Sequence, residues 1–398
     1  MEFKDQLKCF GGQGHFDKVL STSNLYLPDF DRVSMLLSEN RPSSDNEYPL
    51  STILESRLCE YHNAEHCVLY SSGFWALVAA IKLKAIAGKS NVIIPSMTYR
   101  RLADLVHWAG KIPVFVDVYE DGLAVSVEAV REAIDNDTAL ILAVHPIVNC
   151  CHVDSFIELS ARENVPVIFD AVESVHETYK GKRIGSFGVG EVFSFHASKL
   201  INGCEGGYIC TNEADFATDL RSFRDFCVVD SAAGKVFGLD ARPIDGHAAF
   251  ALAGLMEIDK NVAHNREIYS AYKKYLPDVH GLRLLEFDEN EQTSYKNIVI
   301  EVMDDYPVSR DILVRFLNDE GLLARSHYDP PLHAKEYSYG VSVKGMANTN
   351  KVRTKFINMP CGSVVSVGDV EIIIQILKYI EDDTSLNTLL ENTYISPA

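Results

Sequence analysis

The sequence predicts an α/β fold with a large, mostly parallel sheet of seven strands. Seven short apolar runs follow one another between about residues 50 and 245. Several are apolar at every position, which is typical of parallel strands covered on both faces. Apolar residues at helical spacing lie between them, as in segments 75–81 and 127–134. The runs are Cys67–Tyr70, Val92–Pro95, Pro113–Val118, Ala139–Val144, Val165–Phe169, Glu191–Phe195 and Gly207–Cys210.

Beyond about residue 255 the pattern changes to that of a smaller α+β domain. A long helix (Leu252–Tyr275) is expected to connect the two domains, and a strand-like run (Lys296–Val302) follows it. We then expect a helix (Ser309–Leu322), an extended segment (Leu323–Tyr328) and a final helix (Val367–Ile380).

These patterns divide the chain into three parts. Residues 1–50 have little periodicity and many turn formers, so we expect a segment that wraps over the surface or the site. Residues 51–250 form the large domain, and residues 251–398 form the connector helix and the small domain. The last fifteen residues or so are expected to be frayed.

Composition excludes several classes of function. A formal net charge of −19 gives no basic excess for binding nucleic acid. No apolar run is long enough for a membrane span, and no secretion signal is present, so we expect a cytoplasmic protein. The nine cysteines form no C-x-x-C pair and are expected to be reduced. Histidines and cysteines show no metal-ligand spacing, so no metal is expected, and no dinucleotide or Walker motif occurs.

Two chemically capable side chains follow buried runs. Asp170 ends the run 165–169, and Lys199 comes shortly after the run 191–195. Ligands of parallel sheets bind beyond the carboxyl ends of the strands, so these groups can converge there with the turn Ser72–Gly73. An amine and a carboxylate at such an edge suit pyridoxal 5′-phosphate (PLP), which needs a lysine for its Schiff base and an acid at its pyridine nitrogen. Several PLP chemistries fit this pair.

Each of these residues also has a simpler structural explanation. Ser72–Gly73 opens a helix and can be an ordinary N-cap, although the same turn presents free amides to an anion. Asp170 can cap the end of its strand, and an isolated lysine is usually a solvated surface charge. The small residues around Lys199, such as Ala197 and Gly203, favour a crowded site over an exposed helix face.

Several motifs in the same order resemble those of the DegT/DnrJ/EryC1/StrS family, PLP-dependent sugar aminotransferases of fold type I. The resemblance covers roughly residues 45 to 385. Its most specific part is the Schiff-base segment. The matching segments are Phe193–Lys199 with Glu205–Gly207, Val167–Ala171, Lys180–Gly188, Val92–Tyr99, Pro113–Val118, His327–His333 and Asn358–Pro360.

The resemblance implies a role for each matching position. Lys199 would form the Schiff base and then move the proton between the substrate carbon and the cofactor. Asp170 would pair with the pyridinium nitrogen, Tyr99 would stack on the ring, and Glu173 would contact the ring hydroxyl. Tyr99 can alternatively be an aromatic core residue.

The resemblance also implies a phosphate site, where the sequence departs from the family. Ser194 would bind the phosphate together with the backbone amides of Gly73 and Phe74. The family usually has threonine where this chain has Phe74, so one hydroxyl is absent. Ser71 or Ser72 can supply a hydroxyl in its place.

Two loops and an arginine pair also differ from the family pattern. Asp225, in the segment Arg224–Cys227, and Asp240 stand where the family has asparagine, in loops that reach the neighbouring subunit's site. Acids near a phosphate are unfavourable, so these loops are expected to be re-aimed. Arg100–Arg101 is expected to be a surface pair, with anchoring of an anionic substrate as the alternative.

The resemblance implies an aminotransferase that moves an amino group from an amino acid, glutamate in our expectation, to a nucleotide-linked keto sugar. The expected mechanism is ping-pong, and the expected assembly is a homodimer. Transfer to an unlinked cyclitol or keto sugar acid, and a non-catalytic PLP-binding regulator, stay open. A sugar dehydratase is disfavoured, because that sister group has histidine where this chain has Lys199. The acceptor's identity, position of amination and stereochemistry cannot be read from the sequence.

Overall fold

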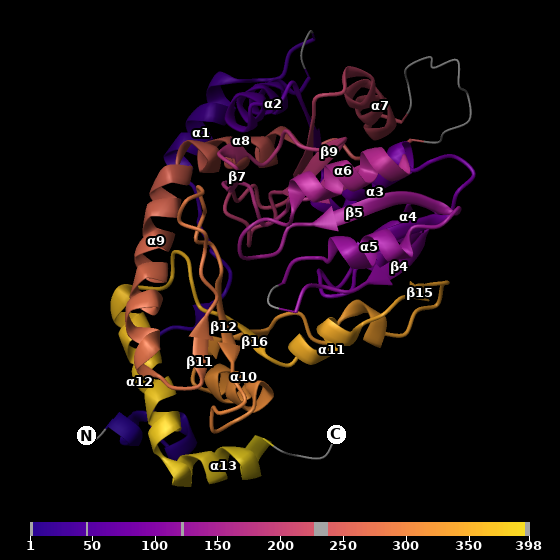
Figure 1. The fold of residues 1–398 in the computed structure, drawn as a ribbon. Coiled ribbons are helices and arrows are strands. Elements are labelled where there is room, and N and C mark those ends of the chain that lie inside the picture. Colours follow the sequence, from indigo (N-terminus) through magenta and orange to yellow (C-terminus); the bar gives the residue numbers. More distant parts are fainter. Residues whose placement is uncertain (1–2, 45–46, 121–122, 227–237, 395–398) are drawn as a thin grey trace.

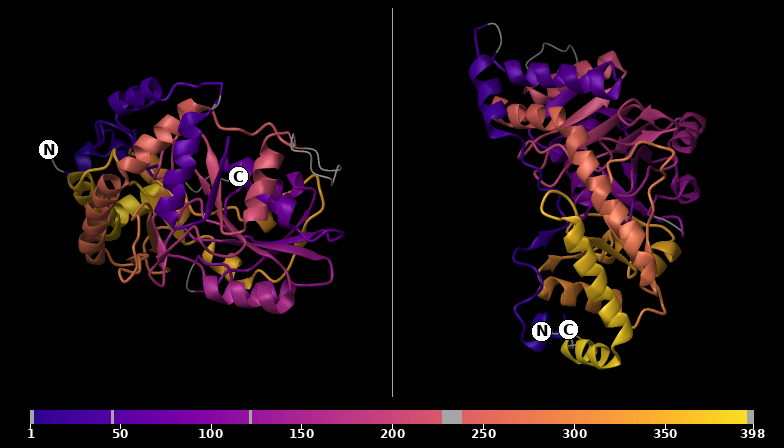
Figure 2. Two further views of the ribbon diagram at one scale, coloured as in Figure 1. Left: turned by 90° about the horizontal axis from the view of Figure 1, so that it is seen from above. Right: turned by 90° about the vertical axis from the view of Figure 1, so that its left-hand side faces the viewer.

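The computed structural model describes residues 3–44, 47–120, 123–226 and 238–394. A larger body and a smaller one are linked by a long helix, α9 (Ile258–Tyr275), which runs along one side of both (Figures 1 and 2). The described residues closest to the two chain ends both lie at the foot of the smaller body (Figure 1). The predicted division near residue 250 falls inside α8 (Asp245–Met256).

The larger body contains an eight-stranded sheet, one strand more than predicted. All seven predicted runs form strands, and the eighth is a two-residue strand at the edge, β15 (Ser342–Val343), which pairs with β4. The sequence analysis missed β15 because two residues, one of them an exposed valine, are too few to show the alternation of a strand. In spatial order the other strands are β4 (Ile112–Val116), β3 (Asn91–Pro95), β5 (Thr138–Val144), β6 (Val167–Asp170), β9 (Gly190–Ser194), β10 (Gly207–Thr211) and β2 (His66–Tyr70).

The sheet is mostly parallel, as predicted. Strand β3 pairs parallel with β4 and β5, and β6 pairs parallel with β5 and β9. Strand β10 is antiparallel to both β9 and β2. Strand β2 therefore runs in the same direction as β9, and its carboxyl end lies at the same edge of the sheet as those of β3, β5, β6 and β9.

Helices cover both faces of this sheet, which explains the continuously apolar strands. One face packs against α3 (Gly73–Lys84), α4 (Leu102–Trp108) and α7 (Ala214–Arg224). The other face packs against α5 (Val127–Ala133) and α6 (Val153–Glu163). At the β9–β10–β2 end this second face is covered by α2 (Pro49–His62) and α8 instead.

The smaller body is an α+β unit, as predicted. Its sheet has the order β11 (Leu282–Leu284), β12 (Ile298–Val302), β16 (Phe356–Met359) and β14 (Arg325–Ser326), with antiparallel pairing throughout. Helices α9, α10 (Arg310–Asp319) and α12 (Val367–Asp382) contribute to its core. The predicted connector helix is in fact two helices, because the chain leaves helical geometry at Glu257 between α8 and α9.

The prediction of a frayed C-terminus was wrong for residues 384–394, which form α13 (Thr384–Tyr394). The Asp383 carboxylate accepts hydrogen bonds from the amides of Ser385 at 2.9 Å and Leu386 at 3.1 Å, as an N-cap does. Leu386 and Leu390 are buried against the smaller body. This cap and apolar spacing were present in the sequence and define the helix.

The N-terminal residues contact both bodies. Strand β1 (Leu20–Ser21) pairs parallel with β13 (Leu322–Leu323) in the smaller body. Helix α1 (Phe30–Glu39) packs on α8 in the larger body, where the rings of Phe30 and Phe250 meet edge to face. The shorter elements are η1 (Phe3–Gln6), η2 (Lys8–Phe10), β7 (Thr178–Tyr179), β8 (Lys182–Arg183), η3 (Leu276–Asp278), η4 (Leu332–Ala334) and α11 (Ala347–Val352).

Within the described ranges, no helix combines the length and the apolar character needed to cross a membrane.

Candidate active site

The predicted site residues lie at one edge of the large sheet because their strands end there. Asp170 is the last residue of β6, and Ser194 is the last residue of β9. Tyr99 follows β3, and Ser72 follows β2 and caps α3. Parallel strand direction therefore brings together side chains as far apart in the sequence as Ser72 and Ser194.

A cavity at this edge lies between the two bodies of the molecule. Asp170, Glu173 and Tyr99 line it from the larger body, and His327 and Tyr328 line it from the segment after β14 in the smaller body. The rest of its wall is mainly apolar and comes from the ends of β3 and β5 and the segments after β3, β4, β5 and β6. The remaining lining residues are Pro95, Met97, Thr98, Leu123, Val125, Val144, His145, Pro146, Ile147 and Val172.

Glu173 forms ion pairs with two lysines. Lys199, in the turn after β9, contacts Glu173 Oε1 through Nζ, and its own amide donates to the His196 carbonyl at 2.8 Å. Lys296, two residues before β12, contacts Glu173 Oε2. The sequence analysis missed Lys296. A lysine just before a strand is ordinary. The sequence offered one signal for its burial, since the strand that follows is apolar up to Glu301.

The two carboxylates of the site have opposite pKa shifts. Burial by itself raises the pKa of Glu173, but the charges of Lys199 and Lys296 outweigh it and lower that pKa to about 2. Burial raises the pKa of Asp170 to about 6, against opposition from the Val172 amide and the charge of Lys199. Glu173 is thus firmly ionised, whereas Asp170 is a buried acid whose charge is only partly compensated.

The environment of Asp170 fits the pyridinium nitrogen of PLP. Asp170 is 2% exposed and lines the cavity, and it takes part in no ion pair among the described residues. One of its carboxylate oxygens accepts from the Val172 amide at 3.2 Å, and its backbone carbonyl accepts from the His145 amide at 3.0 Å. A protonated ring nitrogen would supply the missing cation.

The start of α3 fits a phosphate group. Ser72 Oγ accepts from the Trp75 amide at 3.3 Å, and the first amides of a helix have no partner within it. A Cβ atom at Gly73 would lie 3.0 Å from Ser194 Cβ, so glycine lets the turn approach Ser194. The Phe74 ring packs edge-on against Trp75, with centroids 5.2 Å apart. Phe74 supplies no hydroxyl to this turn, but the hydroxyls of Ser72 and Ser194 are both close to it.

We predict that Gly207→Ala disrupts this turn. A Cβ atom at Gly207 would lie 2.4 Å from the Gly73 nitrogen and 2.8 Å from the Phe193 carbonyl oxygen, and neither backbone can yield easily. We expect ~3 kcal/mol loss of unfolding free energy in urea denaturation. Gly345→Ala, where a Cβ meets nothing within 4 Å, is the control and should stay within about 0.5 kcal/mol of the wild type. Equal stability of the two variants would contradict the prediction.

The charge of Asp225 is balanced by neighbouring arginines. Asp225 lies 3.0 Å from Arg224 Nε and 3.4 Å from Arg242 Nε, so two arginines balance its charge. Asp225 and Asp240 face each other in an isolated antiparallel bridge, and Asp240 is exposed. Cys227, the last residue of that predicted segment, lies outside the described residues.

Arg100 and Arg101 are both exposed. Arg101 pairs with Asp104 at 3.1 Å, one turn along α4, and the Arg100 carbonyl accepts from Lys335 Nζ at 3.2 Å. Both side chains thus lie at the surface, and the alternative role for one of them, anchoring an anionic substrate, stays a prediction.

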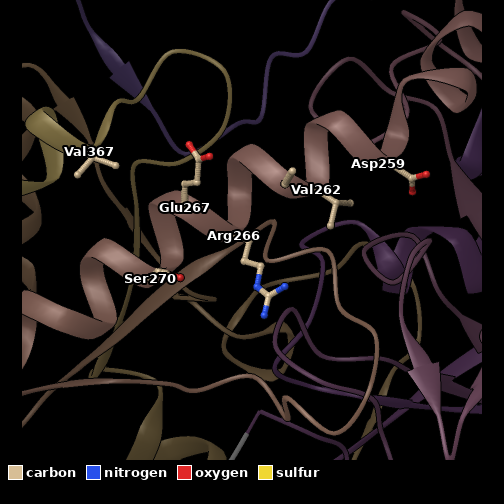
Figure 3. Close-up of a pocket in the computed structure, with 7 residues that line it drawn as sticks. Asp259, Val262, Arg266, Glu267, Ser270 and Val367 are labelled. Carbon is tan, nitrogen blue, oxygen red and sulfur yellow. The ribbon is translucent and has the colours of Figure 1, made fainter.

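A second hollow runs along the outer side of α9 and is lined by Asp259, Val262, Ala263, Arg266, Glu267, Ser270 and Val367 (Figure 3). It is widely open to solvent and contains none of the predicted site residues. The guanidinium of Arg266 lies 5.9 Å from the ring centroid of Tyr295, the residue before Lys296 in the sequence.

A mostly parallel sheet with a lysine, a buried acid and a helix start at its carboxyl edge is an arrangement that suits PLP-dependent enzymes. The chain belongs to the DegT/DnrJ/EryC1/StrS aminotransferase family, whose model matches residues 33–378. It is therefore an aminotransferase, which confirms the predicted family and enzyme class.

Two relatives and two solved structures show how far the likeness extends. The chain is 25% identical to dTDP-4-amino-4,6-dideoxy-D-glucose transaminase of Shigella dysenteriae, over 89% of this chain and 96% of the relative. It is 28% identical to GDP-perosamine synthase of Vibrio cholerae, over 77% and 84% respectively. The crystal structure of DesI with its TDP-sugar product matches with a TM-score of 0.88 at 26% identity, covering 96% of this chain and 98% of DesI. PseC of Helicobacter pylori, at 20% identity and a TM-score of 0.81 over 92% and 100%, shares the fold.

Proposed function

We propose that this enzyme uses PLP to move an amino group from an amino acid, glutamate as the first donor to test, to a keto sugar linked to a nucleotide. The single observation that carries this is the arrangement of Lys199 on Glu173 beside the buried acid Asp170, in a cavity at the carboxyl edge of the sheet. The nucleotide-linked acceptor is supported by the relatives named for dTDP- and GDP-linked sugar chemistry.

In this proposal each side chain acts on a defined part of the cofactor. Bound PLP supplies an electron sink that makes the carbon–hydrogen bond next to the amino group acidic. Asp170 would keep the ring nitrogen protonated, Glu173 would hold the ring hydroxyl, and Tyr99 would cover one ring face. Ser72, Gly73 and Phe74 at the start of α3 would hold the phosphate together with Ser194, which Gly73 approaches closely. Lys199 would hold the cofactor in the resting enzyme and afterwards move the proton between carbon atoms.

A homodimer also belongs to this proposal. Helices α1 and α8 pack together, and around them large apolar side chains are exposed, including Leu27 at 65%, Phe30 at 61%, Ile244 at 60% and Met256 at 58%. So much apolar surface on one part of a molecule is typical of an interface. A dimer in sedimentation velocity is expected, and a monomer with full activity would contradict it. A cytoplasmic location is part of the proposal too, and the free thiols of the eight described cysteines agree with a reducing compartment.

The proposed function is tested in its two half-reactions. Purified enzyme loaded with PLP is mixed with glutamate, and we expect loss of the cofactor's Schiff-base absorbance and release of one 2-oxoglutarate per site. The aminated enzyme is then offered dTDP- and GDP-linked 4-keto-6-deoxy sugars, a keto-cyclitol and an unlinked keto sugar acid. Return of the absorbance with a nucleotide-linked sugar supports the proposal. Return only with an unlinked ketone, or no reaction with any amino donor, would overturn it.

A further inference from the structure

Glu173 is shared by two lysines that reach it from different bodies of the molecule, Lys296 buried and Lys199 half-buried. Lys199 contacts Oε1 from the larger body, and Lys296 contacts Oε2 from the smaller one. Lys296 is 5% exposed, and Glu173 is its one ion-pair partner among the residues that the structure describes. A buried ammonium group needs a counter-charge, so Lys296 and Lys199 compete for the same carboxylate.

The backbone of Lys296 is held independently of this ion pair. Its carbonyl oxygen accepts hydrogen bonds from Asn24 Nδ2 at 3.2 Å and from Cys361 Sγ at 2.9 Å. Asn24 is fixed in turn, because Asn265 Nδ2 donates to Asn24 Oδ1 at 2.9 Å. The N-terminal segment and the loop after β16 therefore fix the backbone of Lys296 without any contribution from Lys199.

Lys199 has to leave Glu173 in order to act. Capture of PLP joins the Lys199 nitrogen to the aldehyde carbon and releases water, and it requires the neutral amine, so the ammonium proton first passes to solvent. A neighbouring carboxylate favours the ammonium form and so opposes this step. If Glu173 had Lys199 alone, the step would also leave a buried carboxylate without a partner, which is strongly unfavourable.

We propose that Lys296 is a positioning residue of the active site, which holds the Glu173 carboxylate and balances its charge so that Lys199 is free to give up its proton and bind the cofactor. The inference rests on one part of the proposed function, the binding of PLP at Lys199. The pKa of Glu173 supports it, since burial is outweighed by the two amines and the carboxyl stays ionised at any physiological pH. Burial lowers the pKa of Lys296 and Glu173 opposes this, so the two charges depend on each other.

Other titratable groups face Glu173 and its two lysines, and the variants used in a test must leave these groups unchanged. They come from β6, from the loops after β3 and β5, and from the segments after β14 and β16. They are Asp170, Tyr99, His145, His327, Tyr328 and Cys361.

The inference is tested with Lys296→Met, which removes the charge, and Lys296→Arg, which keeps it. The rate of PLP capture by cofactor-free protein is followed by absorbance between pH 6 and pH 10. Without Lys296 the carboxylate holds the Lys199 ammonium more strongly. We therefore expect the pH–rate profile to move to higher pH in Lys296→Met, and capture at pH 7 to slow by about tenfold. Lys296→Arg should stay near the wild type.

A double-mutant cycle separates this role from a merely structural one. If Lys296 acts through Glu173, Lys296→Met should hardly move the profile in a Glu173→Gln background. Lys274→Met, at an exposed position of α9, is the matched control. An unchanged profile in Lys296→Met, or the same shift with Gln at position 173, would overturn the inference. Lys296→Gln provides the same comparison if the methionine variant does not fold.

This experiment does not depend on amino transfer. Normal capture of PLP without transfer to any keto sugar would sink the proposed function and leave the inference standing. Amino transfer together with an unchanged pH profile in the Lys296 variants would support the proposed function and overturn the inference about Lys296.

Discussion

Lys199→Ala is expected to abolish amino transfer while the protein still folds and binds PLP. The variant loses both the nucleophile and the proton carrier, and a positioned acid–base group alone contributes ~10²–10⁴-fold to a rate. We therefore expect at least ~10³-fold slower turnover with glutamate and the accepted keto sugar. Lys296 stays on Glu173 in this variant, so no buried carboxylate is left unpaired.

The measurement compares single-turnover rates with the amount of PLP that copurifies with each protein. Lys180→Ala is the matched control, since Lys180 is exposed and pairs with Asp154 on the surface. That control should keep the wild-type rate. Turnover by Lys199→Ala within about tenfold of the wild type would remove Lys199 from the mechanism.

The sequence predicted those parts of the site that depend on local pattern. Asp170 and Lys199 were found because a buried run of strand type ends just before each of them. Ser72–Gly73 was found because serine and glycine mark the start of a helix after a strand. These signals lie within a few residues of each group, and parallel strand direction then places the groups at one edge without any further information.

The missing parts depend on contacts between distant segments. Lys296 stands just before a strand in the other body, where a lysine is ordinary, and only folding brings it to Glu173. Strand β15 has two residues, and its partner β4 is more than two hundred residues away. The break at Glu257 contains neither glycine nor proline, so no local signal separated α8 from α9. In each case contacts between distant segments determine the local structure, because the intrinsic propensity of the residues allows more than one conformation.

Asp170→Asn is expected to inactivate the enzyme and at the same time to stabilise the cofactor-free protein. Transfer should fall because asparagine cannot keep the ring nitrogen protonated. The stability change follows from the pKa of Asp170, which burial raises to about 6. The folded protein thus binds this proton more tightly than the unfolded chain does. The associated stability is fully present below pH ~4 and is lost as the pH rises through about 6.

Above pH 6 the wild-type protein without PLP carries the cost of a buried, poorly compensated carboxylate, up to ~3 kcal/mol for a shift of about two units. Asparagine has a similar shape and no charge, so we expect the variant to melt several degrees higher at pH 8 and at the same temperature at pH 4. PLP should narrow the difference at pH 8, because the pyridinium compensates Asp170 in the wild type and has no such partner in the variant.

Asp117→Asn is the matched control for this measurement. Asp117 is also buried, but its carboxylate accepts hydrogen bonds from the amides of Asn348 and Thr349 at 2.9 and 2.7 Å and from the Thr349 hydroxyl at 2.6 Å. Removing that charge should destabilise the protein by ~1–3 kcal/mol. Opposite signs for the two buried acids would show that Asp170 is kept for chemistry at the expense of stability, as is usual for functional groups. A lower melting temperature for cofactor-free Asp170→Asn at pH 8 would mean that Asp170 supports the fold, and its assignment to the ring nitrogen would lose its physical basis.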